Sequence, residues 1–143
     1  GEISVGTVDK EFDNFQDPKS FTSWNAELEW TPTARDSITL QGFSRPFEQA
    51  GTGLFQDVEQ VSVEWNRDLS RKLSILGGVT IGSVDFGNVA RDDDFDSVKL
   101  GAVYKSSRYS EWALNYEHEE KDSNLAQFNY DSSTVYLSYS LNL

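Results

Sequence analysis

The sequence predicts an antiparallel transmembrane β-barrel with about eight strands in this chain. Apolar and polar residues alternate with a period of two in segments of about ten residues, the length that a tilted strand needs to cross a bilayer. Aromatic residues close successive segments at Trp30, Trp65 and Tyr104, and such rings prefer the level of the lipid headgroups. The connections alternate between short and long, as in barrels whose short turns all lie on one rim.

Length and composition agree with this fold class. The 143 residues suit either a single β-barrel domain over 1–143 or the carboxy-terminal segment of a larger barrel. No stretch approaches the ~20 consecutive apolar residues of a membrane helix. The chain contains no cysteine, which excludes disulfides and thiolate metal sites. The net charge of -12 argues against a nucleic-acid partner, which requires a basic surface.

The first four expected strands cover 2–9, 20–31, 36–46 and 56–66. Each places apolar side chains on one face, because successive side chains in a strand point to opposite sides. Segment by segment, these apolar faces are Ile3 and Val5; Trp24, Ala26, Leu28 and Trp30; Ile38, Leu40 and Gly42; Val61, Val63 and Trp65. The residues between them are mostly polar, as in Asn25, Glu27 and Glu29.

The last four expected strands cover 72–84, 95–105, 110–119 and 134–143. Their apolar faces are Leu73, Ile75, Val79 and Ile81; Val98, Leu100, Ala102 and Tyr104; Trp112, Leu114 and Tyr116; Val135, Leu137, Tyr139, Leu141 and Leu143. The opposite faces carry polar residues and the glycines Gly78, Gly82 and Gly101. Small residues at these positions favour a crowded interior over a solvated exterior.

The connections divide the charge between two rims. The long connections 9–19, 46–57, 85–96 and 117–133 hold 16 of the 24 acidic residues, whereas the short turns near 32–36, 67–72 and 105–110 are mildly basic. Because outer-membrane barrels have short periplasmic turns, we expect an acidic outer rim and a basic periplasmic rim. With an even number of strands, both chain ends fall on the periplasmic side.

Alternation alone does not separate a membrane barrel from a soluble lipocalin-like barrel, whose apolar face points inward. The aromatic segment ends and the unequal connections favour the membrane. The polar face then lines the lumen, and its expected members are Glu27, Glu29, Gln41, Arg45, Glu64, Lys99 and Asn115. The expected aromatic girdle consists of Trp30, Trp65, Tyr104 and Trp112.

No pattern in the sequence favours catalysis, and we expect no enzymatic activity and no cofactor. His118 is the sole histidine; with Ser123 five residues on, it does not define the oriented pair that a serine nucleophile requires. The acidic run offers weak metal candidates in Asp92, Asp93, Asp94 and Asp96. It lacks the ligand spacing and the glycine of a calcium-binding EF-hand loop.

The end of the chain reads "RDDDFDSVKLGAVYKSSRYSEWALNYEHEEKDSNLAQFNYDSSTVYLSYSLNL", and two earlier turns lie in "WTPTARDSITL" and "LSRKLSIL". In these segments the chain resembles a family of outer-membrane β-barrel proteins found with capsule and exopolysaccharide export systems. Members of that family are longer, so the resemblance is to their carboxy-terminal part.

This resemblance implies a barrel in the outer membrane of a Gram-negative bacterium, in contact with outer-membrane lipid. It implies a passive conduit or membrane component for polysaccharide export, together with a periplasmic export partner. A small closed barrel that acts through its acidic outer loops, as an adhesin or a structural anchor, is the alternative function.

Overall fold

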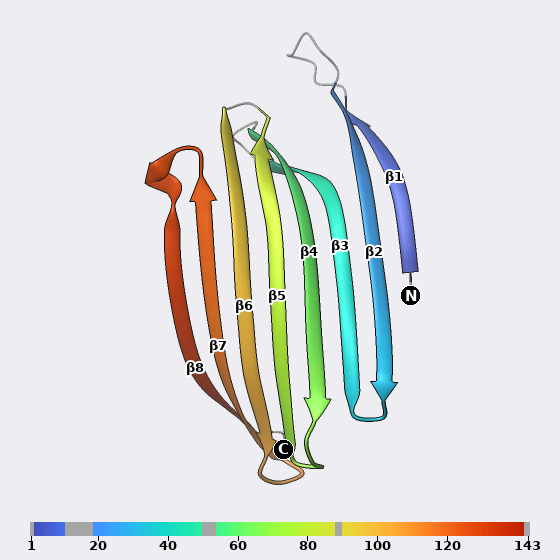
Figure 1. The fold of residues 1–143 in the computed structure, drawn as a ribbon, viewed down its shortest axis with the longest axis vertical. Coiled ribbons are helices and arrows are strands. Elements are labelled where there is room, and N and C mark those ends of the chain that lie inside the picture. The colour runs from blue at the N-terminus through green and yellow to red at the C-terminus, as the bar shows by residue number, and fades with distance from the viewer. Residues whose placement is uncertain (1, 11–18, 50–53, 88–89, 142–143) are drawn as a thin grey trace.

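The computed structural model describes residues 2–10, 19–49, 54–87 and 90–141, which form one antiparallel sheet of eight strands (Figure 1). The strands are β1 (Glu2–Lys10), β2 (Lys19–Thr33), β3 (Asp36–Gln49), β4 (Leu54–Asp68), β5 (Leu73–Phe86), β6 (Arg91–Lys105), β7 (Ser110–Ser123) and β8 (Tyr130–Leu141). One short 3-10 turn, η1 (Ala126–Phe128), precedes β8. Each strand pairs with its neighbours in the sequence, so the strand order is β1 to β8.

The register gives the sheet one apolar and one polar face. Leu40, Val63, Val79 and Val98 are successive cross-strand partners from β3 to β6, and partners in a ladder share a face. Many large apolar side chains of this face are exposed, with Leu28 at 55% and Val135 at 68%. A single curved layer encloses no core against its apolar side, so this face needs an apolar medium to cover it.

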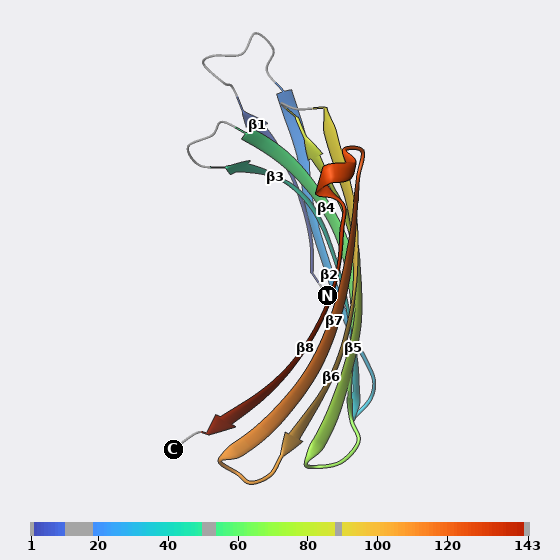
Figure 2. The same ribbon diagram turned by 90° about the vertical axis from the view of Figure 1, so that its left-hand side faces the viewer.

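The sheet is curved but open. Figure 2 shows the strands bending along their length, and among the described residues the edge strands β1 and β8 do not pair with each other. The antiparallel β architecture predicted from the sequence is confirmed. A closed eight-strand barrel is not formed, because each edge strand leaves one side of its backbone without a partner strand.

The strands are longer than predicted at the end where the long connections lie. Residues 91–94 and 120–123, which lie outside the expected strands 95–105 and 110–119, belong to β6 and β7, and β8 begins at Tyr130 rather than at residue 134. That prediction was wrong because polar residues on both faces hide the alternation, although the backbone ladder continues. The predicted loop over 9–19 falls largely on residues outside the described part of the chain.

The short turns lie where they were predicted, and local hydrogen bonds explain them. In the β2–β3 turn, Thr33 Oγ1 donates to Asp36 Oδ2 at 2.5 Å and accepts from the Arg35 N–H at 3.2 Å. In the β4–β5 turn, Ser70 Oγ accepts from the backbone N–H groups of Lys72 and Leu73. Side chains of this type satisfy the backbone groups that a tight turn leaves free.

Within the described ranges, no helix is long and apolar enough to cross a membrane.

Candidate functional site

The polar face brings the residues predicted to line the lumen onto one side of the sheet. Gln41 is the direct partner of Glu27, and Lys99 is the direct partner of both Gly78 and Glu117. The remaining members lie on the same face by the alternation of their strands: Glu29, Arg45, Glu64 and Asn115. The period of two in the sequence was sufficient to group them.

A groove of about 500 Å³ runs across the middle of this face. Its lining includes the side chains of Glu27, Glu29, Thr39, Gln41, Ser62, Glu64, Thr80 and Lys99, with Gly78 in the lining as well. An added Cβ at Gly78 would lie 3.5 Å from the nearest atom, the Val63 carbonyl oxygen. Carboxylates, hydroxyls and an amide therefore line one continuous polar path.

Two polar contacts organise the charges of the groove. Lys99 Nζ lies 3.1 Å from Glu117 Oε1, and Gln41 Nε2 donates to Glu27 Oε2 at 3.0 Å. Among the described residues, Glu29 and Glu64 have no ion-pair partner. The groove thus carries more negative than positive charge, and it can attract cations or accept hydrogen bonds from hydroxyl groups.

Arg45 and Asn115 lie on the polar face but outside this groove. The Arg45 guanidinium packs over the rings of Phe43 and Phe47, 4.3 and 5.0 Å from their centroids. Asn115 covers Gly101, where a Cβ would lie 2.7 Å from the amide oxygen. The groove therefore unites five of the seven predicted lumen residues.

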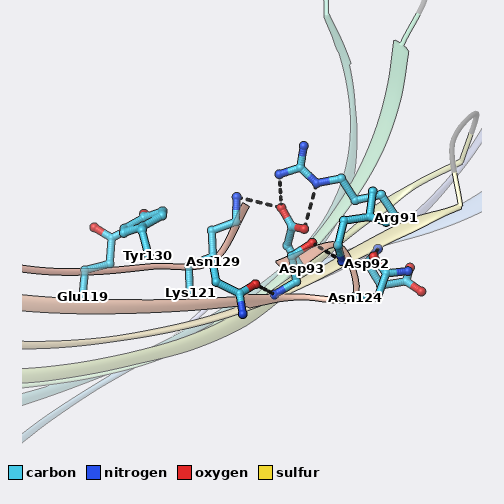
Figure 3. A network of polar contacts seen from close by, with 10 residues as sticks. Arg91, Asp92, Asp93, Glu119, Lys121, Asn124, Asn129 and Tyr130 are labelled. Atoms are coloured by element: carbon cyan, nitrogen blue, oxygen red, sulfur yellow. Dashed lines mark hydrogen bonds and ion pairs between the residues drawn. The ribbon is translucent and has the colours of Figure 1, made fainter. Parts of the chain in front are cut away.

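A second polar cluster lies on the same face, at the end of β6 and β7 where the long connections lie (Figure 3). We call Arg91, Asp93 and Lys121 the mouth cluster. Arg91 donates to both carboxylate oxygens of Asp93, at 2.8 and 2.5 Å, and Lys121 Nζ lies 2.7 Å from Asp93 Oδ2. Asp93 is 1% exposed, so its charge is compensated by two cations in a desolvated setting.

The mouth cluster holds the β7–β8 connection against the sheet. Arg91 lies between the rings of Phe86 and Phe128, 4.4 and 3.6 Å from their centroids. Asn124 reaches across to the start of β6, where its Oδ1 accepts from the Asp92 N–H and its Nδ2 donates to the Ala90 carbonyl. These contacts fix the loop that carries η1 over the outer end of the polar face.

The electrostatics of Asp93 follow from these contacts. Burial alone would raise the pKa of this carboxyl, but hydrogen bonds from Arg91, Lys121 and Ser123 outweigh it and hold the pKa well below its usual range. Asp93 is therefore ionised throughout the physiological range.

The weak metal candidates do not converge on one point. Asp92, Asp94 and Asp96 lie on the face opposite to Asp93, because alternate residues of β6 point to opposite sides. Asp93 itself already binds two cationic side chains. No cluster of three acidic or histidine side chains suited to a metal ion occurs in the part of the chain that the structure covers.

The four aromatic residues predicted as a girdle all lie on the apolar face towards the short turns. Trp30 is 60% exposed, Tyr104 47% and Trp112 44%, and Trp112 packs against Tyr139 with ring centroids 4.7 Å apart. Trp65 is partly buried, and its indole N–H donates to Asp36 Oδ1 at 3.2 Å. This bond ties one ring of the girdle to the β2–β3 turn.

Asp36 is the polar centre of that turn. The hydrogen bond from Thr33 lowers the pKa of Asp36 against the opposing effect of burial, with further lowering by Trp65 and by Arg67 at 3.6 Å. The carboxylate therefore stays ionised and keeps both the turn and the Trp65 ring in place.

His118 lies within β7, on the apolar face. Its Nδ1 is 2.9 Å from Ser133 Oγ and 3.5 Å from Asp131 Oδ1. Ser123, the serine considered from the sequence, points to the opposite face. Because Ser133 and Asp131 meet the same ring nitrogen, they do not form a relay in which one nitrogen takes the serine proton and the other is oriented by the acid.

A curved antiparallel sheet with an exposed apolar face and a polar opposite face is typical of outer-membrane β-barrel proteins. The chain belongs to the family described as "Putative beta-barrel porin 2", whose model matches residues 1–143. The chain is therefore an integral β-barrel protein of the outer membrane of a Gram-negative bacterium, in contact with membrane lipid.

A solved structure shows the same fold. The chain is similar to OmpTdeltaL8, a loop L8 deletion mutant of OmpT, which is an outer membrane protein of Vibrio cholerae, with 15% sequence identity and a TM-score of 0.57. The similarity covers 94% of this chain and 47% of that chain, so this chain spans about half of the matched structure. No curated protein sequence matches the chain.

Sequence reasoning missed the mouth cluster. If residues 91–96 are taken as a strand, the alternation within "RDDDFD" places Asp93 on the face opposite to its acidic neighbours. This signal was available in the sequence. The pairing of Asp93 with Lys121 depends on the register between β6 and β7, which local sequence does not specify.

Proposed function

We propose that this protein is a passive, non-enzymatic conduit across the outer membrane, and that its polar face lines the hydrated path. The groove of about 500 Å³ on that face carries this proposal. The side chains of the groove carry hydrogen-bonding and charged groups, which can replace the hydration water of a solute that passes through. The opposite face is apolar and is exposed to lipid.

The transported material in this proposal is a polysaccharide, as the family resemblance implies. Glu27, Glu29, Gln41 and Glu64 accept hydrogen bonds, which suits the many hydroxyl groups of a sugar chain. A conduit for a sugar chain needs a barrel wider than eight strands, because eight strands enclose room for little more than side chains. The sheet of this chain is open at both edges, which is compatible with such a wider barrel. A periplasmic export partner would contact the basic rim at the short turns.

Single-channel conductance of the purified full-length protein in planar bilayers tests the proposal. We expect stable openings, which neutral oligosaccharides added to the bath partially block. The variant Glu64→Lys should change the conductance, whereas Glu59→Lys on the opposite face should leave it unchanged. A folded, heat-modifiable protein that never opens would refute the conduit, and openings insensitive to oligosaccharides would refute the polysaccharide.

A further inference from the structure

The apolar face contains a groove of about 450 Å³ near the middle of strands β2 to β4. Ala26 and Gly42 are direct cross-strand partners at its floor, and their small size leaves room that the Trp24 ring fills over Gly42 and that stays open beside Ala26. The walls are Trp24, Leu28, Leu40 and Val61. The Trp24 ring lies over Gly42, where an added Cβ would be 2.9 Å from its carbon atoms.

A second hollow of about 480 Å³ continues from this groove towards the outer connections. It shares Trp24 and Val61 with the groove and adds Ile81. Its remaining side chains on the same face are Glu59, Ser83, Asp94, Asp96 and Asp122. The register explains this set, because Glu59, Ser83, Asp94 and Asp122 are successive partners from β4 to β7.

The two hollows together change from apolar to acidic along the direction of the strands. We propose that they form a binding site for a membrane lipid with an amine-bearing headgroup. One hydrocarbon chain would lie in the groove beside Ala26 and the Trp24 ring, and the ammonium group would lie among the carboxylates around Glu59 and Asp94.

Charge complementarity selects this occupant. Four carboxylates around one hollow repel a phosphate group that has no attached cation, and they attract an ammonium group. The groove opens on the face whose large apolar side chains are exposed, such as Val63 at 44% and Val79 at 51%, so a lipid chain is the neighbouring material. The site is independent of the polar groove on the other face.

Native mass spectrometry of the full-length protein, released from micelles that contain defined lipids, tests the site. The probes are phosphatidylethanolamine and phosphatidylglycerol with identical acyl chains. We expect phosphatidylethanolamine to be retained at least threefold more than phosphatidylglycerol. The double variant Glu59→Gln/Asp94→Asn should lose this preference, and Ala26→Leu should reduce retention of both lipids by filling the groove.

The matched control is Asp92→Asn/Asp131→Asn, which removes two carboxylates of the same face outside the hollow and should keep the preference. All variants are checked for the heat-modifiable mobility of a folded barrel. Equal retention of the two lipids, a preference for phosphatidylglycerol with Mg²⁺, or an unchanged Glu59→Gln/Asp94→Asn variant would each overturn the proposal. Conductance is measured separately, so failure here is distinguishable from failure of the conduit.

Discussion

Asp93 is the residue on which the outer end of the polar face depends. Its carboxylate is 1% exposed and binds two cations, Arg91 and Lys121, which are themselves 17% and 22% exposed. Removing one member of a buried pair leaves the remaining charge uncompensated, which is more costly than losing a surface ion pair.

The variant Asp93→Asn should therefore lower the free energy of unfolding by about 2 kcal/mol, measured by urea unfolding in lipid vesicles. The control is Asp92→Asn, on the opposite face and exposed, for which we expect a change below about 0.5 kcal/mol. Equal effects of the two substitutions would show that burial and pairing at Asp93 contribute nothing particular.

The same residue predicts a pH dependence. Because folding lowers the pKa of Asp93, its stabilisation is fully present above the unfolded carboxyl value of about 3.9 and is lost as the pH falls below it. Unfolding midpoints measured from pH 7 down to pH 3 should therefore fall more steeply in the wild type than in Asp93→Asn. Parallel curves would contradict this assignment.

At the scale of elements, the connection between β7 and β8 is held by the Arg91 guanidinium together with the side chain of Asn124. Arg91 stacks between Phe86 and Phe128 while it binds Asp93. The substitution Arg91→Ala should speed hydrogen exchange over residues 124–129 by about tenfold or more, because local opening then breaks fewer contacts. The matched control is Arg108→Ala, which removes a stacked arginine over Tyr109 in a short turn at the other rim. If residues 124–129 exchange at the wild-type rate in Arg91→Ala, the loop is held by other contacts.

The strands also show which features of the fold can be predicted from the sequence. Period-two alternation predicted each strand and placed Glu27, Lys99 and Asn115 on a common face. The face on which a residue lies depends only on whether its position along the strand is odd or even. The prediction failed at 91–94 and 120–123, where both faces are polar and the alternation of hydrophobicity disappears. The contacts of Arg91 with Phe128, and of His118 with Ser133, join different strands, and only the register between those strands brings them together.

At the scale of the whole molecule, the sum of charges on the polar face predicts selectivity. In the groove, Lys99 is compensated by Glu117, while Glu29 and Glu64 have no ion-pair partner among the described residues. A path lined in this way concentrates cations and repels anions. We expect the reversal potential in a KCl gradient to indicate preference for K⁺ over Cl⁻.

The double variant Glu29→Gln/Glu64→Gln should reduce that preference by roughly twofold or more, and Glu120→Gln on the apolar face should leave it intact. Selectivity that is unaffected by Glu29→Gln/Glu64→Gln would place the path elsewhere than on this face.

The strand order has a consequence for how the molecule is made. Every ladder in the described sheet joins strands that are adjacent in the chain, so each new strand is added by closing one loop, at a small entropic cost. Such a sheet can grow by the addition of one strand at a time, and local contacts of this kind form quickly. The slow event in biogenesis is then the closure of the barrel, because closure pairs a first and a last strand that are distant along the chain.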